Sequence, residues 1–143
     1  MKTVGAVLLA CVVIFVLFAV MFTGLYVVMG PEQAFRPKSY EVSVQWIVMS
    51  VALSALAAII GGMIAQKVGE DLGGIWICAL LLLLGLGMAI PSIGAPSPGE
   101  RGGDVASMDA MAKAITPTWV QFLNAFIGPA AAWLGASFIR NRS

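Results

Sequence analysis

Residues 44–90 read VQWIVMSVALSALAAIIGGMIAQKVGEDLGGIWICALLLLLGLGMAI, two long apolar runs separated by the polar stretch 66–71. About 20 apolar residues, at ~1.5 Å rise each, cross the ~30 Å hydrocarbon core of a bilayer as a helix. Because lipid offers the backbone no hydrogen-bond partners, each run is predicted to be helical. The polar stretch is too short for anything but a tight link, so the two helices are predicted to form an antiparallel hairpin.

Two further apolar runs flank this hairpin, one near each end of the chain. The chain of 143 residues is 60% hydrophobic and only 10% charged, whereas a soluble domain carries roughly 25% charged residues. The predicted fold class is therefore all-α: a single integral membrane domain over 1–143, built as an antiparallel four-transmembrane-helix bundle. The predicted spans are 4–29, 44–65, 72–90 and 118–139.

Proline and glycine mark the ends of the first and last spans. Gly30-Pro31 is predicted to stop the first helix, with glycine as a left-handed cap. Thr116-Pro117 is predicted to open the fourth, with a capping hydroxyl followed by proline at the first helical position. Residues 91–103, rich in Pro, Gly and Ser, are predicted to be an irregular loop.

The rest of the third loop shows apolar residues at helical spacing, namely Val105, Met108, Ala112 and Ile115. Asp109 and Lys113 lie four residues apart on another face. This pattern predicts a short amphipathic helix on the membrane surface. A disordered tether is the alternative.

The composition argues against catalysis, metal binding and nucleic-acid binding. The chain contains no histidine, the commonest general base and metal ligand. Cys11 and Cys78 lie in separate apolar runs, without the spacing of a metal site, and are interpreted as packing residues. The apolar run continues through Cys11 to Met29, which argues against a lipoprotein signal. A net charge of +1 gives no case for nucleic acid. We therefore predict no catalytic, cofactor-binding or metal-binding residues and no cofactor.

None of the four runs contains Asp, Glu, Lys or Arg. Ionisable residues inside a membrane usually mark proton relays, ion pathways or substrate sites. Their absence argues against a proton-coupled transporter or a pump. An intramembrane enzyme would have to take its acid chemistry from the third loop, where Glu100, Asp104 and Asp109 lie.

Small residues recur every four positions on two spans. Such stripes let membrane helices approach closely, within one bundle or between subunits. The residues predicted to dock a helix are Ser50, Ser54, Ala58 and Gly62 on the second span and Gly128, Ala132 and Ala136 on the fourth.

A possible polar site lies on the fourth span, at Gln121, Asn124 and Pro129. Proline lacks an amide hydrogen, so Pro129 leaves the carbonyl of Ala125 without its usual donor and is predicted to kink the helix. The amide of Asn124 and that carbonyl are predicted to line a small polar site. Hydrogen bonding to a neighbouring helix is the alternative.

The ends of the helices resemble those of a broad set of small, uncharacterised bacterial four-helix membrane proteins. The shared elements are Gly61-Gly62-Met63-Ile64-Ala65, the Leu- and Gly-rich stretch 80–87, Pro117-Thr118-Trp119 and Ala131-Ala132-Trp133-Leu134-Gly135. The resemblance implies four-helix topology and a bacterial inner (cytoplasmic) membrane, and no activity. Basic residues close to the helix ends, Lys2, Lys67, Arg140 and Arg142, favour cytoplasmic termini.

The leading hypothesis is an accessory or structural subunit of a larger membrane complex, with membrane lipids and other membrane subunits or itself as partners. The alternative is a passive channel or carrier for a small neutral or lipophilic molecule, built around Asn124. An enzyme is not expected.

Overall fold

The computed structural model describes residues 1–95, 99–100, 109 and 112–142. Its elements are α1 (Lys2–Ala34), α2 (Val44–Ala89), the short 3-10 helix η1 (Ile90–Ser92) and α4 (Thr118–Arg140). Within this part of the chain four helical segments are long and apolar enough to cross a membrane, namely Lys2–Ala34, Val44–Glu70, Leu72–Ser92 and Thr118–Arg140. The predicted all-helical fold is thus confirmed, and its four long apolar helices fit a multi-pass membrane protein. Each segment is longer than its predicted span.

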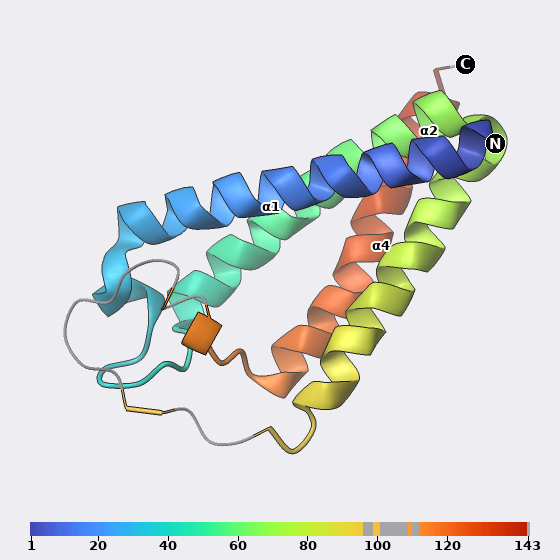
Figure 1. The fold of residues 1–143 in the computed structure, drawn as a ribbon. Coiled ribbons are helices and arrows are strands. Elements are labelled where there is room, and N and C mark those ends of the chain that lie inside the picture. Colours follow the sequence, from blue (N-terminus) through green and yellow to red (C-terminus); the bar gives the residue numbers. More distant parts are fainter. Residues whose placement is uncertain (96–98, 101–108, 110–111, 143) are drawn as a thin grey trace.

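The helix α2 holds the predicted hairpin, because it folds back on itself at Glu70 (Figure 1). We call residues 44–69 its first arm and residues 71–89 its second arm. The predicted link of residues 66–71 was too long, since Gln66 and the residues up to Gly69 are helical and the break is confined to Glu70. The two arms touch next to the turn, where Gly73 lies directly against the carbonyl of Ala65. A Cβ at position 73 would overlap that carbonyl, so only glycine allows this approach.

The helices form two antiparallel pairs. In the first pair, α1 runs along the first arm of α2, with Ile14 against Gly61 near the middle and Tyr26 against the ring of Trp46 further along (ring centroids 6.3 Å apart). In the second pair, α4 runs along the second arm, where Gly85 lies against Ala125. The pairs meet near the Glu70 turn and diverge toward the opposite end (Figure 1).

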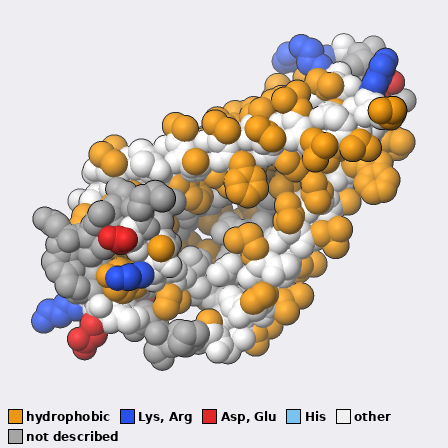
Figure 2. All heavy atoms as spheres, viewed as in Figure 1, with side chains coloured by type: hydrophobic (Ala, Val, Ile, Leu, Met, Phe, Trp, Pro, Cys, Tyr) orange, Lys and Arg blue, Asp and Glu red, His pale blue; other side chains and the backbone are white. Residues whose placement is uncertain are grey.

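Both chain termini lie at the end of the molecule that holds the Glu70 turn (Figure 1). We call this the terminal end, and the opposite one the loop end. Hydrophobic side chains cover the length between them, while charged side chains gather at the two ends (Figure 2). This distribution is the one expected when a bilayer surrounds the middle of the helices.

At the loop end, the chain leaves α1 through the predicted glycine. Gly30 has φ 72°, in the range that favours glycine, and one further helical turn follows from Pro31 to Ala34. The helix therefore bends at the predicted stop and ends a turn later. The first arm of α2 is capped by Ser43, whose hydroxyl accepts from the amide of Trp46 at 3.1 Å.

The connecting segments at the loop end pair with each other through isolated bridges. The amide of Val42 donates to the carbonyl of Ile115 at 3.2 Å, and the amide of Ile115 donates to Tyr40 at 3.0 Å. Beneath them Tyr26, Phe35 and Val120 belong to one buried apolar cluster. This cluster joins the start of α4 to the first helix pair.

At the start of α4 one prediction is wrong, and in the third loop another is only partly covered by the described residues. Pro117 is the N-cap of α4 rather than its first residue, and no side chain caps the helix. The Thr118 hydroxyl instead donates to the carbonyl of Ser92 at 3.1 Å, tying α4 to the end of the second arm. The predicted amphipathic helix falls partly outside the described residues, because Val105 and Met108 are not among them. The described residues Asp109, Ala112 and Lys113 have helical backbone.

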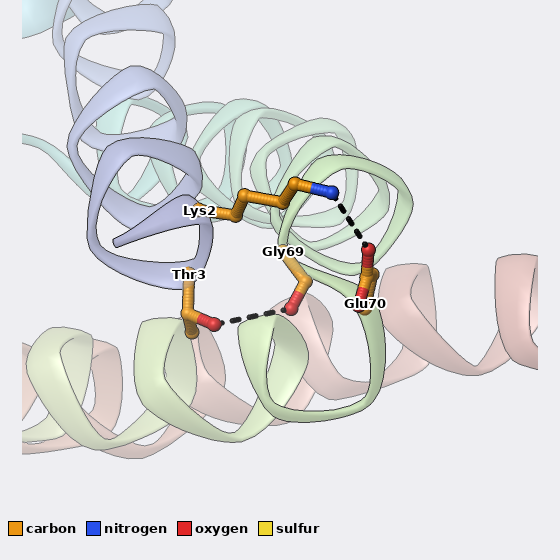
Figure 3. Close-up of polar contacts among 4 residues, drawn as sticks. All are labelled: Lys2, Thr3, Gly69 and Glu70. Carbon is orange, nitrogen blue, oxygen red and sulfur yellow. Dashed lines mark hydrogen bonds and ion pairs between the residues drawn. The ribbon is translucent and has the colours of Figure 1, made fainter.

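Glu70 has φ 56° and ψ −144°, a strained conformation for a residue with a side chain. Contacts from neighbouring residues hold the turn in this conformation. The buried side chain of Gln66 donates to the Glu70 carbonyl at 3.0 Å. From α1, the Thr3 hydroxyl donates to Gly69 at 3.4 Å and the Lys2 ammonium lies 3.7 Å from the Glu70 carboxylate (Figure 3).

Substitution at Glu70 separates backbone strain from the ion pair. Glu70→Ala removes the exposed ion pair but keeps a side chain at positive φ, whereas Glu70→Gly removes both. We expect the glycine variant to be more stable than the alanine variant by about 1 kcal/mol. Unfolding in a mild detergent, followed by circular dichroism, measures this difference. Equal stability of the two variants would show that the turn carries no strain.

Candidate functional site

The two small-residue stripes predicted from the sequence meet each other where the helix pairs cross. A Cβ on Gly62 of α2 would overlap the backbone of Ala132 in α4, and a Cβ on Gly135 would overlap the backbone of Ile59. Ala58 and Ala132 are 2% and 0% exposed. The docking contact of these residues is therefore a contact within the chain, made possible because glycine lets one backbone rest on the other.

The start of the α2 stripe lies on another side of the helix. An α-helix turns about 100° per residue, so residues four apart drift by about 40° at each step. Measured around the axis of α2, Ser54 and Ser50 therefore point within about 20° of the direction of Gly61. Gly61 lies against Ile14 of α1. Both serines are half-buried, and the Ser50 hydroxyl donates to the carbonyl of Ile47 at 3.0 Å. The predicted stripe is thus divided between the two neighbours of the first arm.

The α4 stripe is also used in part. Ala136 is buried against the second arm, where a Cβ on Gly74 would lie 2.7 Å from its own Cβ. Gly128, one turn before Ala132, is different: nothing lies within 4 Å of the position that its Cβ would occupy. Open space therefore begins beside Gly128, at the point where α4 and the first arm have separated, and the surface is hollowed between the two pairs (Figure 2).

Asn124 lies one further turn toward the loop end. Its Oδ1 atom is buried and has no hydrogen-bond partner. At about 100° per residue, Asn124, Gln121 and Gly128 all fall within about 80° of Ala132 around α4, on the side that faces the first arm. A buried acceptor without a donor costs about 1–3 kcal/mol. Such a group, one turn from the open space beside Gly128, marks a candidate binding position.

Pro129 adds a second acceptor nearby. Proline has no amide hydrogen, so the carbonyl of Ala125 lacks the donor that a helix normally supplies. The helix α4 is nevertheless continuous through Pro129, and the carbonyl of Pro129 itself accepts from the Cys78 thiol of the second arm at 3.4 Å. The structure thus places the three predicted polar-site residues on one helix and gives Pro129 a contact with the second arm, the partner of α4 in its own pair. Gln121 is half-buried.

The site is electrically neutral. The predicted spans contain no Asp, Glu, Lys or Arg. No group of three His, Cys, Asp or Glu among the described residues is arranged to hold a metal. Cys11 and Cys78 are free and pack against the same apolar cluster. The arrangement can accept hydrogen bonds, and it offers no acid, base or nucleophile paired with another reactive group.

The residues predicted to dock a helix did not include Gly61, Gly85 or Gly135, the glycines at which helices approach each other closely. Gly85 and Gly135 allow α4 to rest on the two arms of α2, and Gly61 makes room for the side chain of Ile14. Their signal was present, because glycine in a membrane helix commonly marks a close backbone contact. The spacing of four residues selected Ser50 and Ser54 as docking residues, whereas the close helix contacts are made at these glycines.

Comparison with protein-family models, with curated proteins and with solved structures found no match. The site is therefore interpreted from its own residues.

Filling the crossing point should damage the fold itself. In Gly62→Leu the new side chain meets the backbone of Ala132, so α4 and the first arm must separate, and we expect a loss of about 1–3 kcal/mol of stability. Gly87→Leu is the matched control, since Gly87 is exposed and has open space around it. Detergent unfolding midpoints of the two variants give the comparison. A Gly62→Leu protein as stable as the control would contradict the crossing.

Proposed function

We propose that this protein binds a small uncharged molecule that donates a hydrogen bond, in the opening beside Asn124 and Gly128, and acts as a passive carrier or channel for it rather than as an enzyme. The buried, unpartnered Oδ1 of Asn124 is the observation that carries the proposal. A membrane protein retains such a costly group more readily where a ligand satisfies it.

The chemistry of the acceptors limits the ligand. The Oδ1 atom of Asn124 and the carbonyl of Ala125 both accept hydrogen bonds, so the ligand must donate through a hydroxyl, amine or amide group. A charged ligand would need a counter-charge at this depth, and the spans supply none. The neighbouring Gly128 leaves room beside the amide. A neutral solute such as a polyol or an amide fits these conditions.

The test is solute flux through the protein in vesicles. Wild-type protein should speed the entry of glycerol or urea, measured by light scattering after an osmotic step, and Asn124→Leu should abolish that acceleration. The same variant should be more stable by about 1–3 kcal/mol in detergent, because the unsatisfied acceptor is gone. Activity and stability are thus expected to change in opposite directions.

Two controls make this result specific. Gln45→Leu makes the same amide-to-leucine change at an exposed position at the start of α2 and should leave flux unchanged. Gly128→Leu fills the open space without meeting any atom within 4 Å and should block flux while the fold is kept. Wild-type vesicles that take up neither solute faster than empty vesicles would refute the carrier proposal for these probes.

An accessory or structural role in a larger membrane complex is the second proposal. It is supported by α1, which packs along the first arm only and leaves large apolar side chains such as Leu8, Phe15 and Val16 exposed. The faces around Gly62 and Ala132 are occupied by the chain itself. A partner subunit would therefore dock on α1.

Co-purification distinguishes this second proposal. If a partner docks on α1, a tagged wild-type protein purified in mild detergent should retain it, and Gly24→Leu should release it, because Gly24 is exposed with open space around it. Gly87→Leu on the second arm is the control and should retain the partner. A protein that elutes without any partner would remove the support for an accessory role.

For localisation we propose a bacterial inner membrane with cytoplasmic termini. The support is the resemblance described above and the position of Lys2, Lys67, Arg140 and Arg142 close to the helix ends, where basic residues favour the cytoplasmic side.

A further inference from the structure

The two ends of the molecule differ in charge. The terminal end carries four basic side chains, Lys2, Lys67, Arg140 and Arg142, against two acidic residues, Glu70 and Asp71. The segments 35–43 and 93–117 between the other helix ends hold four basic and four acidic residues, and Glu32 lies in the last turn of α1. The terminal end is therefore positive, and the loop end is neutral to slightly negative.

The ion pair described at the terminal end involves one of its four basic side chains. Lys2 lies 3.7 Å from the carboxylate of Glu70 (Figure 3), which occupies that acidic group. Both Lys67 and Arg142 are exposed. These two charges face the surroundings of the helix ends.

Arg140 is held in a defined position at the same end. Its guanidinium carbon lies 4.7 Å from the centroid of the Trp133 ring, and Trp133 is 44% exposed. A guanidinium stacked on an aromatic face keeps its N–H edge available for a second partner, and that planar edge matches the oxygens of a phosphate. Tryptophan itself favours the headgroup level of a bilayer.

The basic side chains of the loop end are engaged differently. The Arg36 guanidinium lies 3.3 Å from the carboxylate of Glu41, and the Lys113 ammonium lies 5.7 Å from the centroid of the Tyr40 ring. Acidic residues accompany them along the same segments. Of the described basic residues at the loop end, Lys38 alone lies outside these two contacts.

From this charge complementarity we infer that the terminal end binds the headgroups of anionic phospholipids. Arg140, oriented by Trp133, contacts the lipid phosphate through its N–H edge, and Lys67 and Arg142 contribute further positive charge. Each basic residue near an anionic surface strengthens binding about fivefold. This interaction anchors the terminal end in an anionic leaflet, and it is independent of the site at Asn124.

Lipid-selective quenching of tryptophan tests the inference. The variant Trp46→Phe/Trp119→Phe keeps only Trp76 and Trp133, which lie toward the terminal end. It is reconstituted with brominated phosphatidylglycerol or brominated phosphatidylcholine at equal mole fraction. We expect stronger quenching by the anionic lipid, a preference that weakens as salt screens the charges. Equal quenching by the two lipids would overturn the inference.

Charge-removing variants in this background locate the contact. Arg140→Gln, Arg142→Gln and Lys67→Gln should each reduce the preference for the anionic lipid about fivefold. Lys38→Gln is the matched control, because Lys38 is an exposed cation at the loop end, and it should leave the preference unchanged. If Lys38→Gln lowers the preference as much as Arg140→Gln does, the binding follows net charge alone and the assignment to the terminal end is wrong.

Discussion

The contact between backbones at Gly62–Ala132 and Gly135–Ile59 determines the arrangement of this protein. Apolar side chains gain little by leaving lipid for one another, so membrane helices associate through close packing where small residues allow it. At this crossing both helices contribute a glycine, and the two pairs are held together there. Every other contact between α4 and α2 follows from the angle that this crossing imposes.

The same crossing explains why the molecule has an opening. Two rigid pairs that touch near the Glu70 turn must separate further along, and they meet again only in the cluster around Val120 at the loop end. Between these contacts lie Gly128, with open space beside it, and Asn124, with a buried acceptor that has no donor. An ideal parallel bundle of the same helices would have filled this space with side chains. The candidate site is thus a consequence of packing geometry.

The charged ends place the helices relative to a membrane and differ from each other. At the terminal end the Glu70 turn, the start of α1 and the end of α4 bring cations from separate parts of the chain to one surface. At the loop end the connecting segments pair with each other, and the Arg36 guanidinium lies against the Glu41 carboxylate. The proposed lipid contact at the terminal end and the proposed solute site between the pairs therefore lie in different regions of the molecule.

Hydropathy alone determined the number of helices and their approximate limits, because a span needs a long uncharged run and the backbone in lipid has no alternative to the helix. The residues Asn124 and Pro129 could also be selected from the sequence, since polar groups and prolines are conspicuous in such runs. Only the tertiary structure decided that Gly62 and Ala132 face each other, that Ser50 turns toward α1, and that Gly128 borders open space. The physical reason is that the direction of a side chain depends on helix rotation and crossing angle. Contacts between distant residues set both, and local sequence sets neither.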